Sequence, residues 1–231
     1  MNQLPVNKII FASFAFVLMN WRKIVEISIL PLLLSLPLLT LSAEIIDFLN
    51  IFTEKSAVKT EDIQLPSGIV AYALLSLCGH ISLSINMYRL VIFGADSVSW
   101  MPIFKLRQIV GFLGLTFFIN LVTGLPLLFA DLMWIHLAVS FFLVPISLNF
   151  INIATDQSLK FKWEISVITQ VNLFFLQILL PLLSAMAINF LISSTGLPDI
   201  ISWIVKVIVF YWTLINLALC YQLITQSNTS K

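Results

Sequence analysis

A histidine in the middle of a long apolar segment is the residue of this 231-residue chain best placed to do chemistry. His80 has Ser76 and Ser84 one helical turn away on either side. Charging an ionisable group near the centre of a membrane is costly, so such residues mark candidate functional sites. His80 is therefore a candidate ligand or proton-relay site. The alternative is a neutral imidazole that hydrogen-bonds across a helix interface, to Asn120 or another asparagine.

Lys206 is the second candidate ligand site. It lies six residues into the last apolar segment, about 9 Å from the end of that segment at the helical rise of 1.5 Å per residue. An ammonium group at this depth can bind a lipid phosphate or another anion. Alternatively, its long side chain extends outward to Asp199 or to the lipid head groups.

The sequence predicts no catalytic residues, no metal site and no cofactor. It contains no H-E-x-x-H, G-x-S-x-G, P-loop or G-x-G-x-x-G motif. Cys78 and Cys220 lie in apolar segments without C-x-x-C spacing, which favours small buried side chains over a disulfide or metal ligands. His136 lies only about 6 Å from the outer end of its segment, so its depth does not match that of His80 for shared haem ligation. We therefore predict that the chain is not an enzyme.

The composition indicates a membrane protein. Apolar residues make up 60% of the chain, charged residues 10%, and the mean hydropathy is +1.04. Soluble domains have about 45–50% apolar and about 25% charged residues. A soluble fold of this size cannot bury so many apolar side chains, so lipid must cover the rest. The net charge of +1 gives no reason to expect a nucleic-acid partner.

The apolar segments predict an all-α polytopic membrane protein, one integral-membrane domain over residues 1–231. Each segment reaches the roughly 20 residues that a helix needs to cross the hydrocarbon. Helices are expected because lipid cannot satisfy exposed backbone groups. The six predicted transmembrane helices cover residues 24–50, 67–93, 108–128, 132–153, 166–192 and 200–224.

Two further segments flank the first span. The run Ile9–Met19 is too short to span, and basic residues lie on both sides of it. Residues 1–23 are therefore predicted to form an N-terminal interfacial helix, or alternatively a continuation of the first span. Residues 51–66 form an acidic external loop, interpreted as a solvated connector, with a lid or receptor-like loop as the alternative.

Basic residues set the predicted orientation, because they accumulate on the cytoplasmic side of membrane proteins. Of the 12 Lys and Arg residues, only Lys55, Lys59 and Lys206 fall on the other side of the predicted spans. Both termini are therefore predicted to be cytoplasmic. The residues expected to contact cytoplasmic lipid head groups are Arg22, Lys23, Arg89, Lys105, Arg107, Lys160 and Lys162.

The cytoplasmic entrances to spans one, three and five share a composition. Each has a tryptophan close to basic residues, namely Trp21, Trp100 and Trp163. This pattern predicts three similar helical hairpins, as in transporters with internal repeats. The alternative is that Trp and basic residues mark any cytoplasmic interface.

A motif carries the one family resemblance. It runs from Pro145 through Asn149 to Ala154-Thr155-Asp156, then Ser158-Leu159, Trp163 and Asn172. This stretch resembles uncharacterised bacterial six-helix inner-membrane proteins related to the membrane domain attached to some glycerophosphodiester phosphodiesterases. The resemblance implies a multi-pass protein of the bacterial plasma (inner) membrane. It implies no enzymatic activity.

We therefore predict a non-enzymatic inner-membrane protein that acts through lipids or membrane partners, in envelope maintenance or as an assembly subunit. Its expected partners are membrane lipids, together with a membrane protein or further copies of the chain. The alternative is a small-solute transporter or channel with a site near His80. Prolines that interrupt the apolar helices favour this alternative, because broken helices form substrate sites in transporters; they are Pro31, Pro37, Pro145 and Pro181.

Overall fold

The computed structural model of this chain describes residues 4–41, 67–100, 105–128, 133–160, 162–196 and 199–229. Of these residues, 88% are helical and none forms a strand. Six helices are long and apolar enough to cross a membrane. The predicted all-α class and the six membrane-spanning candidates are confirmed.

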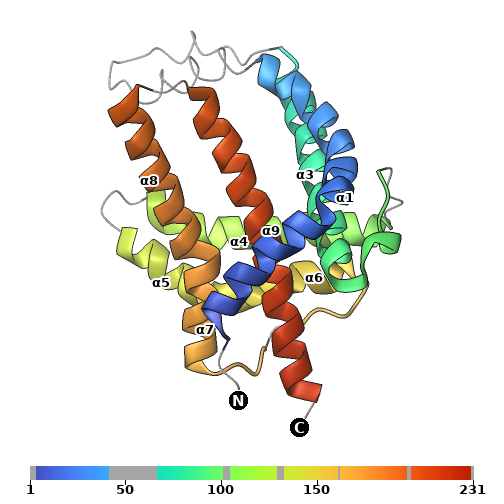
Figure 1. The fold of residues 1–231 in the computed structure, drawn as a ribbon, viewed down its shortest axis with the longest axis vertical. Helices are drawn as coiled ribbons and strands as arrows, with labels where there is room; N and C mark the ends of the chain where they lie inside the picture. Colours follow the sequence, from blue (N-terminus) through green and yellow to red (C-terminus); the bar gives the residue numbers. More distant parts are fainter. Residues whose placement is uncertain are drawn as a thin grey trace.

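The helices follow one another along the chain as drawn in Figure 1. Short 3-10 or π turns join several of these helices directly. Some of the predicted spans therefore consist of two or three elements. The elements are α1 (Val6–Thr40), α3 (Ile69–Phe93), η2 (Ala95–Ser97), α4 (Leu106–Gly124), η3 (Leu125–Leu128), α5 (Met133–Leu143), η4 (Val144–Leu148), α6 (Asn149–Ala154), α7 (Val167–Phe174), the π segment η5 (Phe175–Leu179), α8 (Leu180–Thr195) and α9 (Asp199–Thr229).

The first span differs from its prediction, because α1 is one helix of 35 residues. No Gly or Pro interrupts the polar stretch after Met19, and its side chains fit a helix. Asn20 Nδ2 donates to the Phe16 carbonyl oxygen (3.0 Å), and Lys23 pairs with Glu26 (3.0 Å). Over the described residues, the stretch before the first span is therefore part of one helix, Val6–Thr40, which is the alternative of a continuous first span. The predicted loop 51–66 lies outside the described residues.

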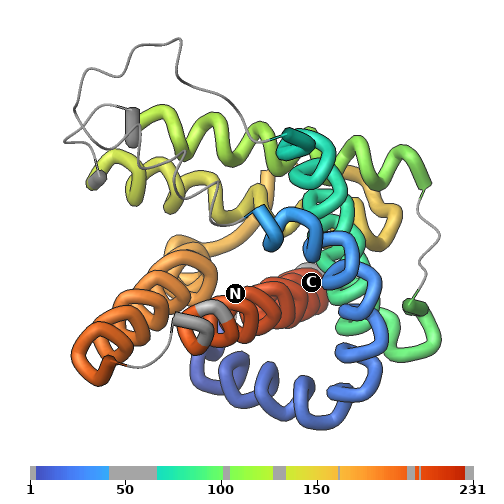
Figure 2. The backbone as a smooth tube through the Cα atoms, turned by 90° about the horizontal axis from the view of Figure 1, so that it is seen from above, coloured from blue at the N-terminus to red at the C-terminus, as the bar shows by residue number. Residues whose placement is uncertain are grey.

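The first half of α1 crosses the other helices. At 1.5 Å per residue, 35 residues extend about 52 Å, well beyond the roughly 30 Å of hydrocarbon. Figures 1 and 2 show α1 passing across α9 and then turning to run beside α3. Trp212 Nε1 donates to Ser13 Oγ (2.6 Å), and Asn172 Nδ2 donates to the Leu4 carbonyl oxygen (2.8 Å). These contacts fix the start of α1 to α9 and α7.

The α4 and α5 helices lie side by side and run across α3, α8 and α9 rather than alongside them (Figures 1 and 2). The α6 helix contacts both α3 and α4, so it links the crossing pair to the other helices. The described helices therefore do not form a bundle of parallel spans. Neither the apolar segments nor their lengths indicate this crossing.

The core lies where α3, α6 and α9 meet. These three helices contact one another through fully buried aliphatic side chains, among them Ile85, Ile151 and Ile215. Large apolar side chains cover much of the outside, and in α1 Phe11, Leu18 and Met19 are 75–83% exposed. Such a surface fits contact with lipid rather than with water.

Gly79 allows α1 and α3 to approach closely. A Cβ atom on Gly79 would lie 3.0 Å from the carbonyl oxygen and 3.2 Å from Cα of Pro31. Gly79→Ala should therefore separate the two backbones and lower the free energy of unfolding by about 1–3 kcal/mol, the usual penalty of overpacking. Thermal unfolding in detergent measures the loss.

Gly114→Ala provides the matched control for this test. A Cβ atom on Gly114 of α4 would meet nothing within 4 Å. Because alanine has a higher helix propensity than glycine, this variant should match or slightly exceed the wild-type melting temperature. Equal melting temperatures for the two variants would contradict the close approach of α1 and α3.

Candidate functional site

Pro181 disturbs the helix that forms one wall of the candidate site. In a regular α-helix the amide of residue 181 would donate to the carbonyl oxygen of Gln177, but proline has no N–H. The chain forms a π segment at Phe175–Leu179, in which the Leu180 N–H donates to the Phe175 carbonyl oxygen. Single π turns of this kind are frequent at functional sites. The local sequence therefore places Gln177 in the irregular part of the helix.

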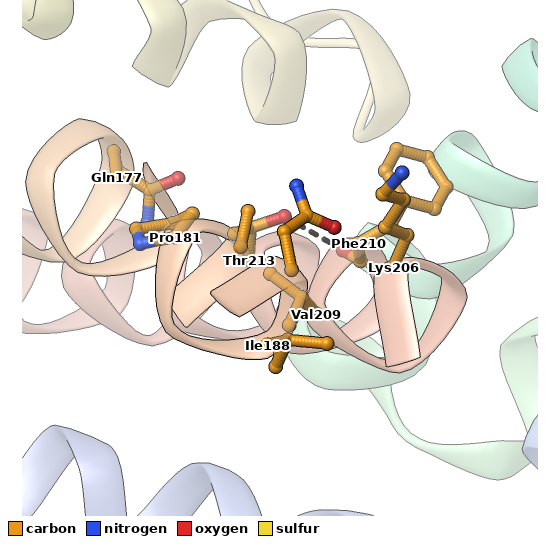
Figure 3. A pocket seen from close by; sticks show the side chains of 9 residues that line it. Gln177, Pro181, Ile188, Lys206, Val209, Phe210 and Thr213 are labelled. Carbon is orange, nitrogen blue, oxygen red and sulfur yellow. Dashed lines mark hydrogen bonds between the residues drawn. The ribbon is translucent and has the colours of Figure 1, made fainter. Parts of the chain in front are cut away.

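A groove of about 350 Å³ lies between the α7–α8 segment and α9. We define the groove by Gln177, Pro181, Ala185, Ile188 and Asn189 on one wall and Lys206, Val209, Phe210 and Thr213 on the other. Figure 3 places Gln177 and Lys206 towards opposite ends, with Thr213 between them. The groove thus has mostly apolar walls, with Gln177 and Lys206 towards its ends and Thr213 between them, and its volume is within the size range of ligand sites.

A second cavity of about 370 Å³, the chamber, lies where α4 and α5 cross α9. His136 Nδ1 donates to the Thr123 carbonyl oxygen (2.6 Å), which ties α5 to the end of α4 beside the chamber. Tyr88, Phe150 and several aliphatic side chains complete its walls. Its polar lining consists mainly of Asn120, Thr123, His136, Ser140 and Ser147, together with Gln177 and Thr213.

The groove and the chamber meet at Gln177 and Thr213, which line both. Along α9, the groove is lined from Lys206 to Thr213 and the chamber from Thr213 to Leu217, so the two cavities follow each other along the helix. Gln177 Nε2 is buried and has no hydrogen-bond partner among the described residues. A donor of this kind inside a membrane protein favours a bound acceptor.

His80 is exposed on α3 and borders only a small cavity. Its Nδ1–H donates to the Ser76 carbonyl oxygen of its own helix (2.8 Å), and its ring packs edge-on against Phe210 at 5.8 Å between centroids. The cavity beside His80 measures only about 70 Å³. Asn120, the proposed partner across the interface, instead donates to the Thr116 carbonyl oxygen of its own helix (2.8 Å). His80 lines neither the groove nor the chamber.

Basic residues gather around Asp156. Lys105 forms an ion pair with Asp156, and Arg107 and Arg89 lie close enough to act on the carboxylate. The hydrogen bond from Lys105 lowers the pKa of Asp156, against a smaller opposing effect of desolvation. A lowered folded-state pKa stabilises the fold above the ordinary aspartate pKa, and this contribution is lost as the pH falls through the folded-state value. Both side chains are exposed, so the pair adds little stability.

Two of the predicted Trp and basic-residue pairs form cation–π contacts. The Arg22 guanidinium carbon lies 5.4 Å from the Trp21 ring centroid, and Lys160 Nζ lies 5.4 Å from that of Trp163. Lys162 is exposed in the same linker. These geometries fit amphipathic side chains at a membrane interface.

Asparagines fold the linker after α6 back onto the core. Asn149 Nδ2 donates to the Lys160 carbonyl oxygen and Asn149 Oδ1 accepts from the Lys160 N–H, both at 2.8 Å. Asn152 Nδ2 donates to Asn149 Oδ1 (3.0 Å). The Tyr221 hydroxyl of α9 lies 2.8 Å from Asn152 Oδ1 and 2.7 Å from Gln157 Oε1. This network stabilises the motif region around residues 145–163.

Sequence reasoning missed most of the groove. It identified Lys206, and the groove contains it, but it did not single out Gln177, Asn189 or Thr213. Two signals were available. Lys206 and Thr213 are seven residues apart and so share a helix face, and Pro181 follows Gln177 by the four residues of an α-helical hydrogen bond. Within the described residues, no three His, Cys, Asp or Glu side chains group in a way that could hold a metal ion.

Tyr221→Phe should destabilise the linker network. Removal of the hydroxyl leaves the buried Asn152 Oδ1 without this donor, and an unsatisfied buried acceptor costs about 1–3 kcal/mol. Tyr211→Phe is the matched control, because Ser28, its partner, keeps a hydrogen bond to the Ile24 carbonyl oxygen. Thermal unfolding in detergent should show the larger loss for Tyr221→Phe. The reverse order would contradict the network.

Comparisons with protein-family models, with curated proteins and with solved structures find no match to this chain.

Proposed function

We propose that this chain is a non-enzymatic protein of the bacterial plasma membrane that acts by taking a lipid molecule into the groove. One observation carries the proposal, namely a mostly apolar groove with a few polar side chains, Lys206 towards one end, that lies between membrane-spanning candidates. A phospholipid has a polar head group and apolar acyl chains, so it matches the Lys206 end of the groove together with the apolar walls beside that end. Such grooves supply apolar contact area along the chain and a few polar groups for orientation.

The same proposal includes an arrangement in the membrane. It consists of three helical hairpins, α1 with α3, α4 with α5 and α8 with α9, with both termini in the cytoplasm. The two helices of each pair contact each other. The start of α1 and the end of α9 lie at the same end of the molecule, opposite the junction of α8 and α9 (Figure 1). The basic residues of the linkers support a cytoplasmic position for the end that carries the termini.

Single cysteines test this orientation in a variant that lacks Cys78 and Cys220. A membrane-impermeant maleimide added to spheroplasts should label Ser194→Cys, at the exposed end of α8. It should label Lys162→Cys only after the membrane is permeabilised, because that linker is assigned to the cytoplasm. Labelling of Lys162→Cys in intact spheroplasts would reverse the orientation.

Lipid retention tests the proposed function itself. The protein extracted with its surrounding membrane should keep phospholipid after exchange into mild detergent, as measured by native mass spectrometry. Ala185→Phe places a large ring on the groove wall and should strongly reduce the retained lipid. Ala187→Phe is the matched control, because Ala187 lies on the exposed side of α8 and does not line the groove.

A small-solute transporter is the second candidate, and the chamber is the observation that favours it. The chamber carries the more polar lining, and Gln177 and Thr213 line both it and the groove. Under this alternative the wild type retains no lipid, and proteoliposomes swell in iso-osmotic solutes small enough to enter. That result would contradict the lipid proposal. A transporter site near His80 is disfavoured by its cavity of about 70 Å³.

A further inference from the structure

The outer half of α9 has little protein around it. Ile204, Val207 and Ile208 are 53%, 44% and 57% exposed, and Lys206 is exposed among them. Further along the helix, Leu214, Ile215 and Leu217 are buried in the core. The same helix therefore changes from a buried element to one that lipid can reach, and this change occurs along the groove.

The wall of the groove carries one sign of charge. Lys206 contributes an ammonium group, and none of the side chains that define the groove is acidic. Electrostatic attraction between an ammonium group and an anion is strong in a setting of low dielectric constant. The charge of the groove therefore favours an anionic ligand group at the Lys206 end.

Asn189 supplies a second donor at that end. Its Oδ1 accepts a hydrogen bond from Ser202 Oγ (3.2 Å), so its NH₂ group is the part of the amide that remains to donate. Ser202 and Lys206 are one helical turn apart on α9, facing α8. Hydrogen bonds from an ammonium group and an amide to phosphate oxygens are charge-assisted, which makes them short and strong.

The middle of the groove suits a hydrocarbon chain. Between Lys206 and Thr213 the wall of α9 presents Val209 and Phe210, and α8 presents the small side chain of Ala185. Seven residues of α9 extend about 10 Å, which is within the roughly 15 Å hydrocarbon depth of one leaflet. The apolar length favours a lipid over a free phosphate ion, because free phosphate would use only one end of the groove.

We infer that the Lys206 and Asn189 end of the groove binds the phosphate of a phospholipid head group, with one acyl chain along Ala185 and Val209. Figure 3 shows the Lys206 side chain beside Phe210, at the end of the groove away from Gln177. The inference rests on the proposed function and names the class of lipid. By the predicted orientation, this lipid belongs to the outer leaflet.

The test compares lipids that share their acyl chains. Wild-type protein in detergent receives an equimolar mixture of phosphatidylglycerol, phosphatidylcholine and diacylglycerol, and native mass spectrometry reports the bound fraction of each. Both phospholipids should bind at least about tenfold more than diacylglycerol, because a charged hydrogen bond contributes on the order of that factor or more. Lys206→Gln should remove most of this preference, and Lys206→Arg should keep it.

Lys8→Gln is the control for charge alone, because Lys8 is exposed at the start of α1 and does not line the groove. It should keep the wild-type preference, and equal melting temperatures show that each variant is folded.

If diacylglycerol binds as well as the phospholipids and Lys206→Gln changes nothing, the inference is wrong and the proposed function stands. If the wild type binds none of the three lipids, the proposed function itself is wrong. Displacement of the lipid by soluble glycerol phosphate would overturn the assignment of the site to a lipid.

Discussion

Every backbone carbonyl of a membrane-spanning helix needs a donor, because lipid offers none. Pro181 removes the amide that would serve the Gln177 carbonyl, and the helix responds with the π segment Phe175–Leu179. This irregular turn lies where the groove and the chamber meet, and Gln177 lines both cavities. The irregular turn lies directly before the residue that lacks an amide hydrogen. Pro31 and Pro37, by contrast, lie inside an α-helix without a π segment, so the proline acts here together with its surroundings.

The two halves of α9 have different structural roles. A polar contact to α1 lies between them. In the buried half, Tyr221 binds the asparagine network that folds the linker after α6 onto the core. Near the middle, Trp212 holds the start of α1 across the helix through Ser13. The half with Lys206 is more exposed, at Ile204, Val207 and Ile208, and borders the groove. Under the proposed function, a helix that is anchored at one end and exposed at the other suits lipid binding, because a lipid reaches the site laterally from within the membrane.

Hydropathy predicted five of the six spans to within a few residues, because helix length and apolarity depend on the local sequence. His80 was chosen for its depth within a predicted span. That depth does not reveal which helices lie beside a residue. The chamber depends on the way α4 and α5 cross α9. This crossing is a feature of tertiary packing, and the periodicity of apolar residues in a single sequence does not reveal it. Lys206 could be predicted because a charge on an apolar helix is rare. For Gln177 the only sequence signal was Pro181 four residues later, and its position on the groove depends on the helix opposite.

The threefold repeat stays a prediction, for which the linkers can be compared with the buried positions before them. The linkers differ, because the left-handed residue is Gly94 directly after α3 but Asp156 two residues after α6. The core positions agree better: Asn86, Asn149 and Asn216 are each buried, and each follows a fully buried aliphatic residue, namely Ile85, Leu148 and Ile215. Two of these asparagines bind the linker that follows their helix, Asn86 through the Ser99 carbonyl oxygen (3.4 Å) and Asn149 through Lys160. Among the described residues the Asn216 amide has no partner. A buried aliphatic–asparagine pair thus recurs, with Ile151–Asn152 as a further pair within α6. It ties a linker to its helix at Asn86 and Asn149.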